Sequence, residues 1–71
     1  MRLFDLLMTV EPATIVSVQF HEHDTESYCA LKEAQDFTVG ESRLFKVKYF
    51  YPERYNSMHC IGITVIVEEA S

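Results

Sequence analysis

The chain has 71 residues, a formal net charge of −5 and 48% hydrophobic residues. This length supports one domain with a modest core, and the composition excludes a disordered chain. The negative charge argues against nonspecific binding to DNA or to anionic membranes, which requires clustered positive charge. We also expect no membrane-spanning helix, because no apolar run approaches the roughly 18 residues that a span requires.

The compartment is predicted from the cysteines and the N-terminal residues. Cys29 and Cys60 permit at most one internal disulfide, which is too few for a disulfide scaffold. Asp5 interrupts the N-terminal apolar run and no small-residue cleavage site follows it, so we expect no signal peptide. We therefore expect a cytoplasmic protein with reduced cysteines. The modest core favours added stability from a partner or from a homodimer.

The first predicted element is a short N-terminal helix. Four apolar residues recur at the spacing i, i+3, i+4, i+7, namely Leu3, Leu6, Leu7 and Val10. Pro12 ends this helix at about Val10, because the residue before a proline avoids helical dihedrals. So short a helix requires a surface on which its apolar face can dock.

Two strands are predicted next. Residues 14–20 are rich in β-branched side chains and place Val16, Val18 and Phe20 on one face. A polar turn over 21–25 follows. Residues 28–33 then predict a second strand in a hairpin with the first. A helix over 27–35 is the alternative, because good helix formers follow Cys29.

The C-terminal half predicts a turn and two more strands. Residues 39–42 predict a turn in which Gly40 is free to adopt a positive φ. A strand over 44–51 is stopped by Pro52, with one face formed by Phe45, Val47, Tyr49 and Tyr51. After a polar loop over 53–57, a last strand spans 60–67, where Gly62 marks a bulge or a close approach of backbone.

Together these elements predict an α+β fold in a single domain over residues 1–71. A short N-terminal helix packs on a mostly antiparallel sheet of about four strands, since the connections are short. The helix covers one face of the sheet, and the other face is turned toward solvent or a partner.

An acidic segment is the first candidate binding surface. Between residues 22 and 41, Lys32 is the only basic residue, and the carboxylates are Glu22, Asp24, Glu26, Glu33, Asp36 and Glu41. Carboxylates spaced along a surface can imitate a phosphate backbone and occupy the groove of a nucleic-acid-binding protein. The alternative interpretation is a solvated face that aids solubility.

A basic and aromatic segment over 43–55 is the second candidate. Tyrosine and arginine dominate the energetics of protein interfaces, which favours a protein-binding patch of Phe50, Tyr51, Arg54 and Tyr55. In the alternative, these aromatics only cover the sheet edge. A nucleic-acid-binding role is a further alternative, with cations and an aromatic ring supplied by Lys46, Lys48, Arg54 and Tyr55. The net negative charge makes nucleic acid the less favoured partner.

Histidines and cysteines raise the question of a metal site. Imidazole and thiolate ligands suit zinc, and the candidate ligands are His21, His23, Cys29, His59 and Cys60. Their spacing matches neither a Cys-x-x-Cys pair nor a zinc finger, so we expect no metal and no cofactor. A zinc-stabilised structural domain stays an alternative. Because no nucleophile signature is present either, we expect no catalytic residues and no enzyme.

The order of elements resembles small accessory proteins of bacteriophages and prophages of Firmicutes. The resemblance lies in the opening Leu3-Phe4-Asp5-Leu6-Leu7, the strand over 14–20, and the closing segments 46–49 and 63–68. Such proteins begin with a "DLL" or "ELL" helix and end with a β-hairpin, and some small acidic ones bind and inhibit host defence systems, including CRISPR–Cas effectors. The resemblance implies a phage-encoded inhibitor that occludes the surface of a host protein, such as a nucleic-acid-binding defence effector, in the host cytoplasm.

Overall fold

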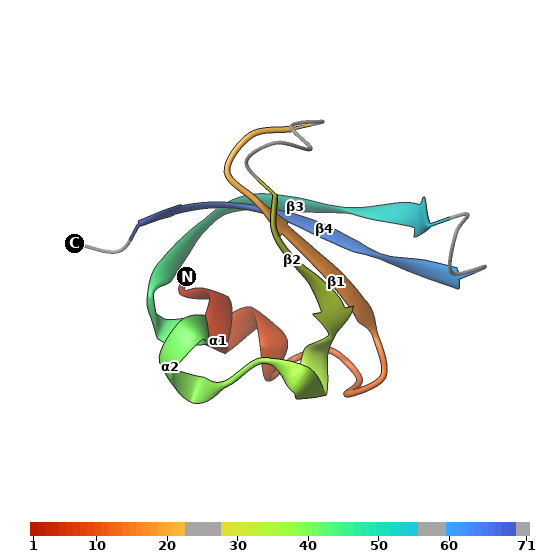
Figure 1. The fold of residues 1–71 in the computed structure, drawn as a ribbon, viewed down its shortest axis with the longest axis horizontal. Coiled ribbons are helices and arrows are strands. Elements are labelled where there is room, and N and C mark those ends of the chain that lie inside the picture. The colour runs from red at the N-terminus through yellow and green to blue at the C-terminus, as the bar shows by residue number, and fades with distance from the viewer. Residues whose placement is uncertain (23–27, 56–59, 70–71) are drawn as a thin grey trace.

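Short helices lie against one face of a four-stranded sheet in the computed structural model, which describes residues 1–22, 28–55 and 60–69 (Figure 1). The helical elements are α1 (Leu3–Leu7), the 3-10 helix η1 (Ala34–Asp36) and α2 (Val39–Arg43). The strands are β1 (Ile15–Gln19), β2 (Tyr28–Glu33), β3 (Phe45–Tyr55) and β4 (Cys60–Glu69). The predicted α+β class is confirmed. No helix of the described residues is long and apolar enough to cross a membrane.

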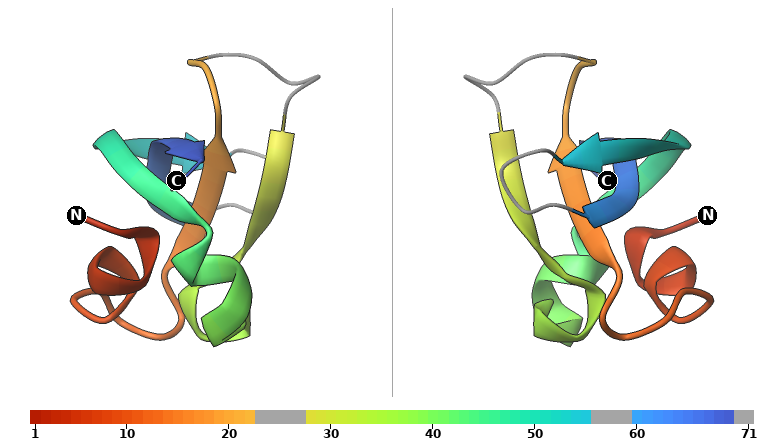
Figure 2. Two further views of the ribbon diagram at one scale, coloured as in Figure 1. Left: turned by 90° about the vertical axis from the view of Figure 1, so that its left-hand side faces the viewer. Right: turned by 90° about the vertical axis from the view of Figure 1, so that its right-hand side faces the viewer.

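The sheet has the strand order β2-β1-β4-β3. The outer pairs β1–β2 and β3–β4 are antiparallel, and the central pair β1–β4 is parallel. The prediction of a mostly antiparallel sheet is therefore confirmed. The second strand is also confirmed as a strand over 28–33, so the helical alternative for this segment is wrong. Figure 2 shows that α1 and α2 lie on the same side of the sheet.

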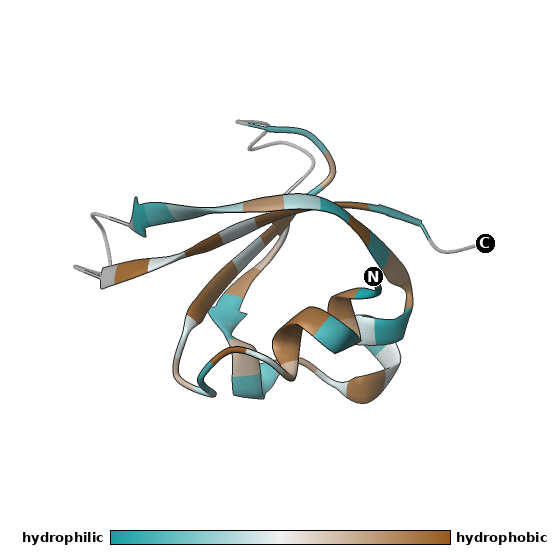
Figure 3. Cartoon of the chain, turned by 180° about the vertical axis from the view of Figure 1, so that it is seen from behind, coloured by the Kyte–Doolittle hydropathy of each residue, from teal (hydrophilic) through white to brown (hydrophobic). Residues whose placement is uncertain are grey.

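The hydrophobic core lies between these helices and the sheet. Its buried residues are Leu3, Leu6, Val16, Val18, Ala34, Val65 and Val67. Figure 3 shows hydrophobic residues along α1 and along the middle of β4. Burial of this apolar surface is the main stabilising term, at about 25 cal/mol per Å² removed from water. The predicted docking of the N-terminal helix on the sheet is confirmed.

Helix α1 is shorter than the apolar spacing predicted. It ends at Leu7, with Met8 as its C-cap, three residues before Val10. The backbone N–H of Thr9 donates to the Leu6 carbonyl at 3.0 Å, and the Thr9 hydroxyl donates to the same carbonyl at 2.7 Å. These bonds satisfy a carbonyl that a longer helix would have used, so the chain turns here while Val10 still packs against the core.

Residues 39–42 form part of helix α2, so the predicted turn is wrong. Thr38 is the N-cap, and its hydroxyl accepts from the Glu41 N–H at 3.1 Å. The Glu41 carboxylate in turn accepts from the Thr38 N–H at 2.8 Å. This reciprocal capping box begins a helix even across Gly40. Gly40 is therefore a helical residue, and its predicted positive φ was an incorrect inference from the glycine alone.

Strand β3 continues through Pro52 to Tyr55, so the predicted stop at the proline is wrong. Pro52 pairs with Ile63 of β4 on one side, and on its other side β3 has no neighbouring strand because it is the last in the sheet order. An edge strand tolerates proline when the missing N–H would have pointed to solvent. Residues 53–55 of the predicted polar loop therefore belong to the strand, and residues 56 and 57 lie outside the described residues.

A register shift in β3 reverses the predicted faces of Tyr49, Phe50 and Tyr51, whereas Phe45 shares a face with Val47 as predicted. The shift lies between Val47 and Tyr49, which pair with the consecutive residues Val67 and Ile66. The extra residue is Lys48, and a bulge of this kind exchanges the two faces beyond it. Val47 therefore packs against the core, whereas Tyr49 lies on the opposite face of the sheet. Gly62, where a bulge or a close approach of backbone was expected, pairs regularly with Glu53, so the bulge is not found.

Candidate functional site

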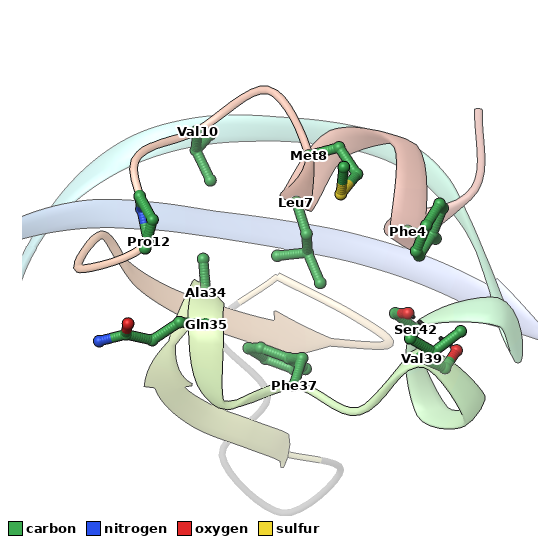
Figure 4. A pocket seen from close by; sticks show the side chains of 10 residues that line it. All are labelled: Phe4, Leu7, Met8, Val10, Pro12, Ala34, Gln35, Phe37, Val39 and Ser42. Atoms are coloured by element: carbon green, nitrogen blue, oxygen red, sulfur yellow. Dashed lines mark hydrogen bonds between the residues drawn. The ribbon is translucent and has the colours of Figure 1, made fainter.

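An apolar groove separates α1 from the segment formed by η1 and α2 (Figure 4). Its volume is about 450 Å³. The lining residues are Phe4, Leu7, Met8, Val10, Pro12, Ala34, Gln35, Phe37, Val39 and Ser42. Eight of these ten are apolar, so the groove is a hydrophobic depression in the helical layer of the molecule.

One side of the groove is formed by α1 and the other by η1 and α2. The two sides meet only in part, where Arg43 of α2 contacts Phe4 of α1. Met8 at the end of α1 is 72% exposed, and Val39 at the start of α2 is 55% exposed. Between them, Leu7 and Phe37 are partly buried and pack against the core. Because both helices are only five residues long, they leave this part of the core open to solvent.

A lysine and a carboxylate fix the position of Phe37. The Lys32 ammonium lies 4.7 Å from the centre of the Phe37 ring and 2.7 Å from the Glu41 carboxylate. The hydrogen bond from Lys32, together with that from the Thr38 N–H, holds the pKa of Glu41 below its usual value. Strand β2 and helix α2 are thereby joined behind Phe37. The ring also borders a second cavity of about 220 Å³, which the exposed Leu44 lines as well.

Two arginines lie at the end of the groove beside Phe4. At one end the Arg43 guanidinium lies 5.2 Å from the centre of the Phe4 ring. Arg2 adds a second cation there, because its Nη1 donates to the Arg43 carbonyl at 3.1 Å. The Asp5 carboxylate lies close to them, because it accepts from the Arg2 N–H at 3.1 Å. Glu11 and Asp36 are exposed sequence neighbours of lining residues but do not themselves line the groove.

The end of the groove beside Pro12 and Gln35 is held together by the backbone. The Gln35 N–H donates to the Pro12 carbonyl at 3.0 Å, and the Ala34 N–H donates to the Thr14 carbonyl at 2.8 Å. These bonds join η1 to the turn that carries Glu11. Neither Glu11 nor Asp36 forms an ion pair within residues 1–22, 28–55 and 60–69. Both carboxylates are therefore open to a charged partner.

The opposite face of the sheet has a different character, because its buried residues include polar ones. Ser17 and Thr64 are fully buried. The Gln19 side-chain amide donates to the Ser17 hydroxyl at 3.0 Å, and the Thr64 hydroxyl donates to the Glu53 carboxylate. Gln19 Oε1 is buried without a hydrogen-bond partner in the described part of the chain.

Two tyrosines cover part of this face. The rings of Tyr49 and Tyr51 stack with centres 6.4 Å apart. The Tyr49 hydroxyl donates to the Glu22 carboxylate at 2.9 Å. This hydrogen bond, more than the burial of the ring, raises the pKa of Tyr49. The polar groups of this face mostly bond to one another, which leaves few of them for a ligand.

The predicted acidic surface is divided between the two faces. Glu41 is bound to Lys32 on the helix side, whereas Glu22 binds Tyr49 on the opposite face. Glu33 lies at the end of β2, and Asp36 is exposed in η1 beside the groove. The remaining two predicted residues, Asp24 and Glu26, lie outside the described residues.

The predicted aromatic and basic patch is divided as well. Phe50 is exposed and pairs with Val65, which places it on the same face as the core, while Tyr51 lies on the opposite face beside Tyr49. Arg54 is exposed and shares the face of Phe50. Tyr55 is in β3, but its side chain is outside the described part. The lysines of the nucleic-acid alternative, Lys46 and Lys48, are exposed on the edge strand.

The structure describes the side chain of only one candidate metal ligand, His21. His21 is exposed just after β1. The side chains of His23, Cys29, His59 and Cys60 all lie outside the described residues. Among the described residues, no group of three or more potential ligands converges. The zinc alternative thus stays a prediction.

The groove was not predicted from the sequence. Residues 39–42 were interpreted as a turn, so the second helix that forms one side of the groove was missing. The signal that would have found it is Thr38-Val39-Gly40-Glu41, which has the spacing of a capping box. The exposed apolar residues Met8 and Val39 can be recognised as two sides of a groove only when the positions of both helices are known.

Similarity to known proteins assigns no family to this chain. No protein-family model matches it, and neither a curated protein nor a solved structure matches it. The apolar groove, with its exposed sides, is the feature of the described residues that best supports a function.

Proposed function

We propose that this chain is a protein-binding module that holds a segment of another protein in the apolar groove. The observation that carries this proposal is the exposure of large apolar side chains on both sides of the groove, Met8 at 72% and Val39 at 55%. Contiguous exposed apolar surface is unfavourable in water and commonly marks an interaction site. A partner that covers both side chains would remove this surface from water.

A protein segment suits the groove better than a small molecule does. Sites for small ligands bury about 70–90% of the ligand surface. A groove whose sides are this exposed covers a ligand from one direction only. A polypeptide segment can place its apolar side chains in the groove while the rest of the partner supplies further contacts.

The lining of the groove supports binding rather than catalysis. Its only polar side chains are those of Gln35 and Ser42. The Ser42 hydroxyl donates to the Val39 carbonyl at 2.9 Å, which is a local helix contact. Neither group is paired with a base in the way that an activated nucleophile requires.

A more specific version follows from the resemblance to phage and prophage accessory proteins. The partner would be a host defence protein, and the chain would inhibit it by covering a surface that the partner needs. The small size of the domain and its net charge of −5 support this version, since an acidic binder can occupy a basic functional surface. This identity of the partner stays a prediction.

The experiment compares two net-charge-neutral double variants in affinity capture from a bacterial host lysate. Met8→Lys with Val39→Glu places charges in the groove, and each charge suits its helix end. The matched control, Ile61→Lys with Phe50→Glu, changes two residues that are 67% and 47% exposed in the β3–β4 hairpin. Circular dichroism and thermal melting establish that both variants are folded.

We expect one host protein to be captured by the wild type and by the control but lost with the groove variant. Capture that survives in the groove variant would show that the groove is not the binding site. Loss in the control alone would move the site to the hairpin that carries Phe50 and Arg54.

A further inference from the structure

The tip of the β3–β4 hairpin is a two-stranded arm that extends beyond the helices (Figure 1). The described pairing of β4 with β1 begins at Ile63, so residues 60–62 pair with β3 alone. Large apolar surface is open on this arm, because Phe50 is 47% exposed and Ile61 is 67% exposed. The exposed side chains on the helix side of the arm form the arm patch, which consists of Phe50, Pro52, Arg54 and Ile61.

We propose that the arm patch joins two copies of this chain in a weak symmetric dimer. The two arms pack face to face and run antiparallel, so that Phe50 of each copy lies on Arg54 of the partner subunit. Pro52 lies at the twofold axis, and Ile61 adds apolar surface on both sides of it. This inference stands apart from the proposed function, because no residue of the arm patch lines the groove.

A second copy fits the arm patch because the patch is complementary to itself. Phe50 and Arg54 share one face of β3, and Pro52 lies halfway between them in the strand. A twofold axis at Pro52, perpendicular to the strands, exchanges the two positions and brings each guanidinium onto the partner's ring. An arginine over an aromatic face is a favourable contact, and the chain already forms one, where Arg43 lies 5.2 Å from the centre of the Phe4 ring.

The antiparallel arrangement follows from the position of the helices. They lie on the same side of the sheet as the arm patch (Figure 2). If the two arms ran parallel, both helical layers would lie at the same end of the dimer, between the two sheets, and would collide. Antiparallel arms place the helical layers at opposite ends, so that only the arms overlap.

Phe50 and Arg54 are both open to a contact with another chain. In the described part of the chain, neither forms an ion pair, a ring contact or a cation–π contact. The neighbouring Glu53 lies on the opposite face, where its carboxylate accepts from the Thr64 hydroxyl. A two-stranded hairpin is marginally stable in water unless its apolar face is packed. The arm of a second copy supplies that packing.

The small size of the arm patch limits the strength of the dimer. Specific stable interfaces bury about 1,200–2,000 Å² in total, and four side chains from each copy bury less than this. The net charge of −5 on each copy adds a repulsion that salt screens. We therefore expect a Kd on the order of 100 µM at about 0.15 M salt.

Sedimentation equilibrium of the full chain tests the dimer at concentrations from about 10 µM to about 1 mM. We expect the average mass to rise from that of one chain toward that of two. Phe50→Arg sets arginine against arginine and should raise the Kd at least about tenfold. The matched control, Leu44→Arg, makes the same change in charge at a side chain that is 60% exposed outside the arm, and it should leave the Kd unchanged. Circular dichroism and thermal melting establish that both variants are folded.

An exchange of the two residues gives a sharper result. Phe50→Arg combined with Arg54→Phe restores a ring opposite each guanidinium, but only if the two positions face each other across a twofold axis. We therefore expect the double variant to recover the dimer that Phe50→Arg alone loses. Its net charge equals that of the wild type, so the recovery cannot come from a change in overall repulsion.

Three outcomes would overturn the inference. The first is a wild type that remains monomeric at about 1 mM. The second is an equal effect of Phe50→Arg and Leu44→Arg, which would place any dimer contact outside the arm. The third is a double variant that does not recover the dimer. The groove variant Met8→Lys, Val39→Glu should dimerise as the wild type does, so the dimer and the protein-binding groove are tested independently.

Discussion

The two faces of the sheet are stabilised in different ways. On the helix side, Leu3 and Val16 are buried in an apolar core, and the short helices leave a groove beside it. On the opposite face, Ser17 and Thr64 are equally buried but are polar and hydrogen-bonded within the sheet. The comparison indicates that the helix side, which exposes apolar surface, is the face available to a partner, whereas the polar groups of the opposite face bond mostly to one another.

The largest expected effect tests the apolar side of this comparison. Leu3→Ala removes a side chain that is 1% exposed, and it should lower the free energy of unfolding by about 2–5 kcal/mol. Urea denaturation followed by circular dichroism measures this change. Met8→Ala is the control, because an exposed side chain should change stability by less than about 0.5 kcal/mol. Equal effects of the two substitutions would contradict the placement of the core.

Thr64→Val tests the polar side. It keeps the shape of the side chain but removes the hydroxyl that donates to Glu53, so we expect a loss of about 1–3 kcal/mol in unfolding free energy. A double-mutant cycle with Glu53→Gln separates their coupling from other effects. If Thr64→Val is neutral or stabilising, this face is held by packing, and the contrast between the faces disappears.

Gly40→Ala tests whether α2 is a helix in solution. A Cβ at Gly40 would meet no atom within 4 Å, and the residue lies inside the helix. Alanine should therefore raise the free energy of unfolding by about 0.5–1 kcal/mol, since it restricts the unfolded chain. Thermal melting detects the gain. A loss instead would indicate a turn at this position and would remove one side of the groove.

The smallest effect concerns the one ion pair described on the helix side. The folded-state pKa of Glu41 is lowered by Lys32, so the stabilisation exists above the ordinary value of 4.5 and is lost as pH falls through the lowered one. Glu41→Gln keeps the cap but removes the charge. On acidification, the free energy of unfolding of the wild type should fall by about 0.2–1 kcal/mol more than that of this variant. The difference is small because both side chains of the ion pair are about one-third exposed. Parallel acid-dependent urea titrations that show no difference would mean that the pair contributes nothing.

Most of the fold could be predicted from local patterns. The alternation in residues 14–20 and 60–67 predicted strands that the structure has, and Val16 and Val18, predicted to share a face, both lie in the core, because side-chain periodicity depends only on neighbours in the sequence. Thr38 and Glu41 carry an equally local signal for α2, the spacing of a capping box, whereas the prediction of a turn rested on Gly40 alone. That error was avoidable.

The errors that concern β3 could not be avoided by local reasoning. Whether Pro52 ends a strand depends on whether the strand lies at a sheet edge, which is a property of the assembled fold. The faces of Tyr49 and Phe50 depend on the register shift at Lys48, which is set by pairing with β4. The groove likewise depends on how far apart two helices lie, so its residues share no pattern in the sequence.

The parallel pairing of β1 with β4 has a consequence for the order in which the chain can fold. Val16 and Ile63 are partners at the centre of the sheet, although most of the chain lies between them. During synthesis on the ribosome, β1 and β2 can form only an isolated hairpin, which is marginally stable in water. The core closes when β4 has left the exit tunnel, so nascent chains arrested before that point should remain sensitive to protease.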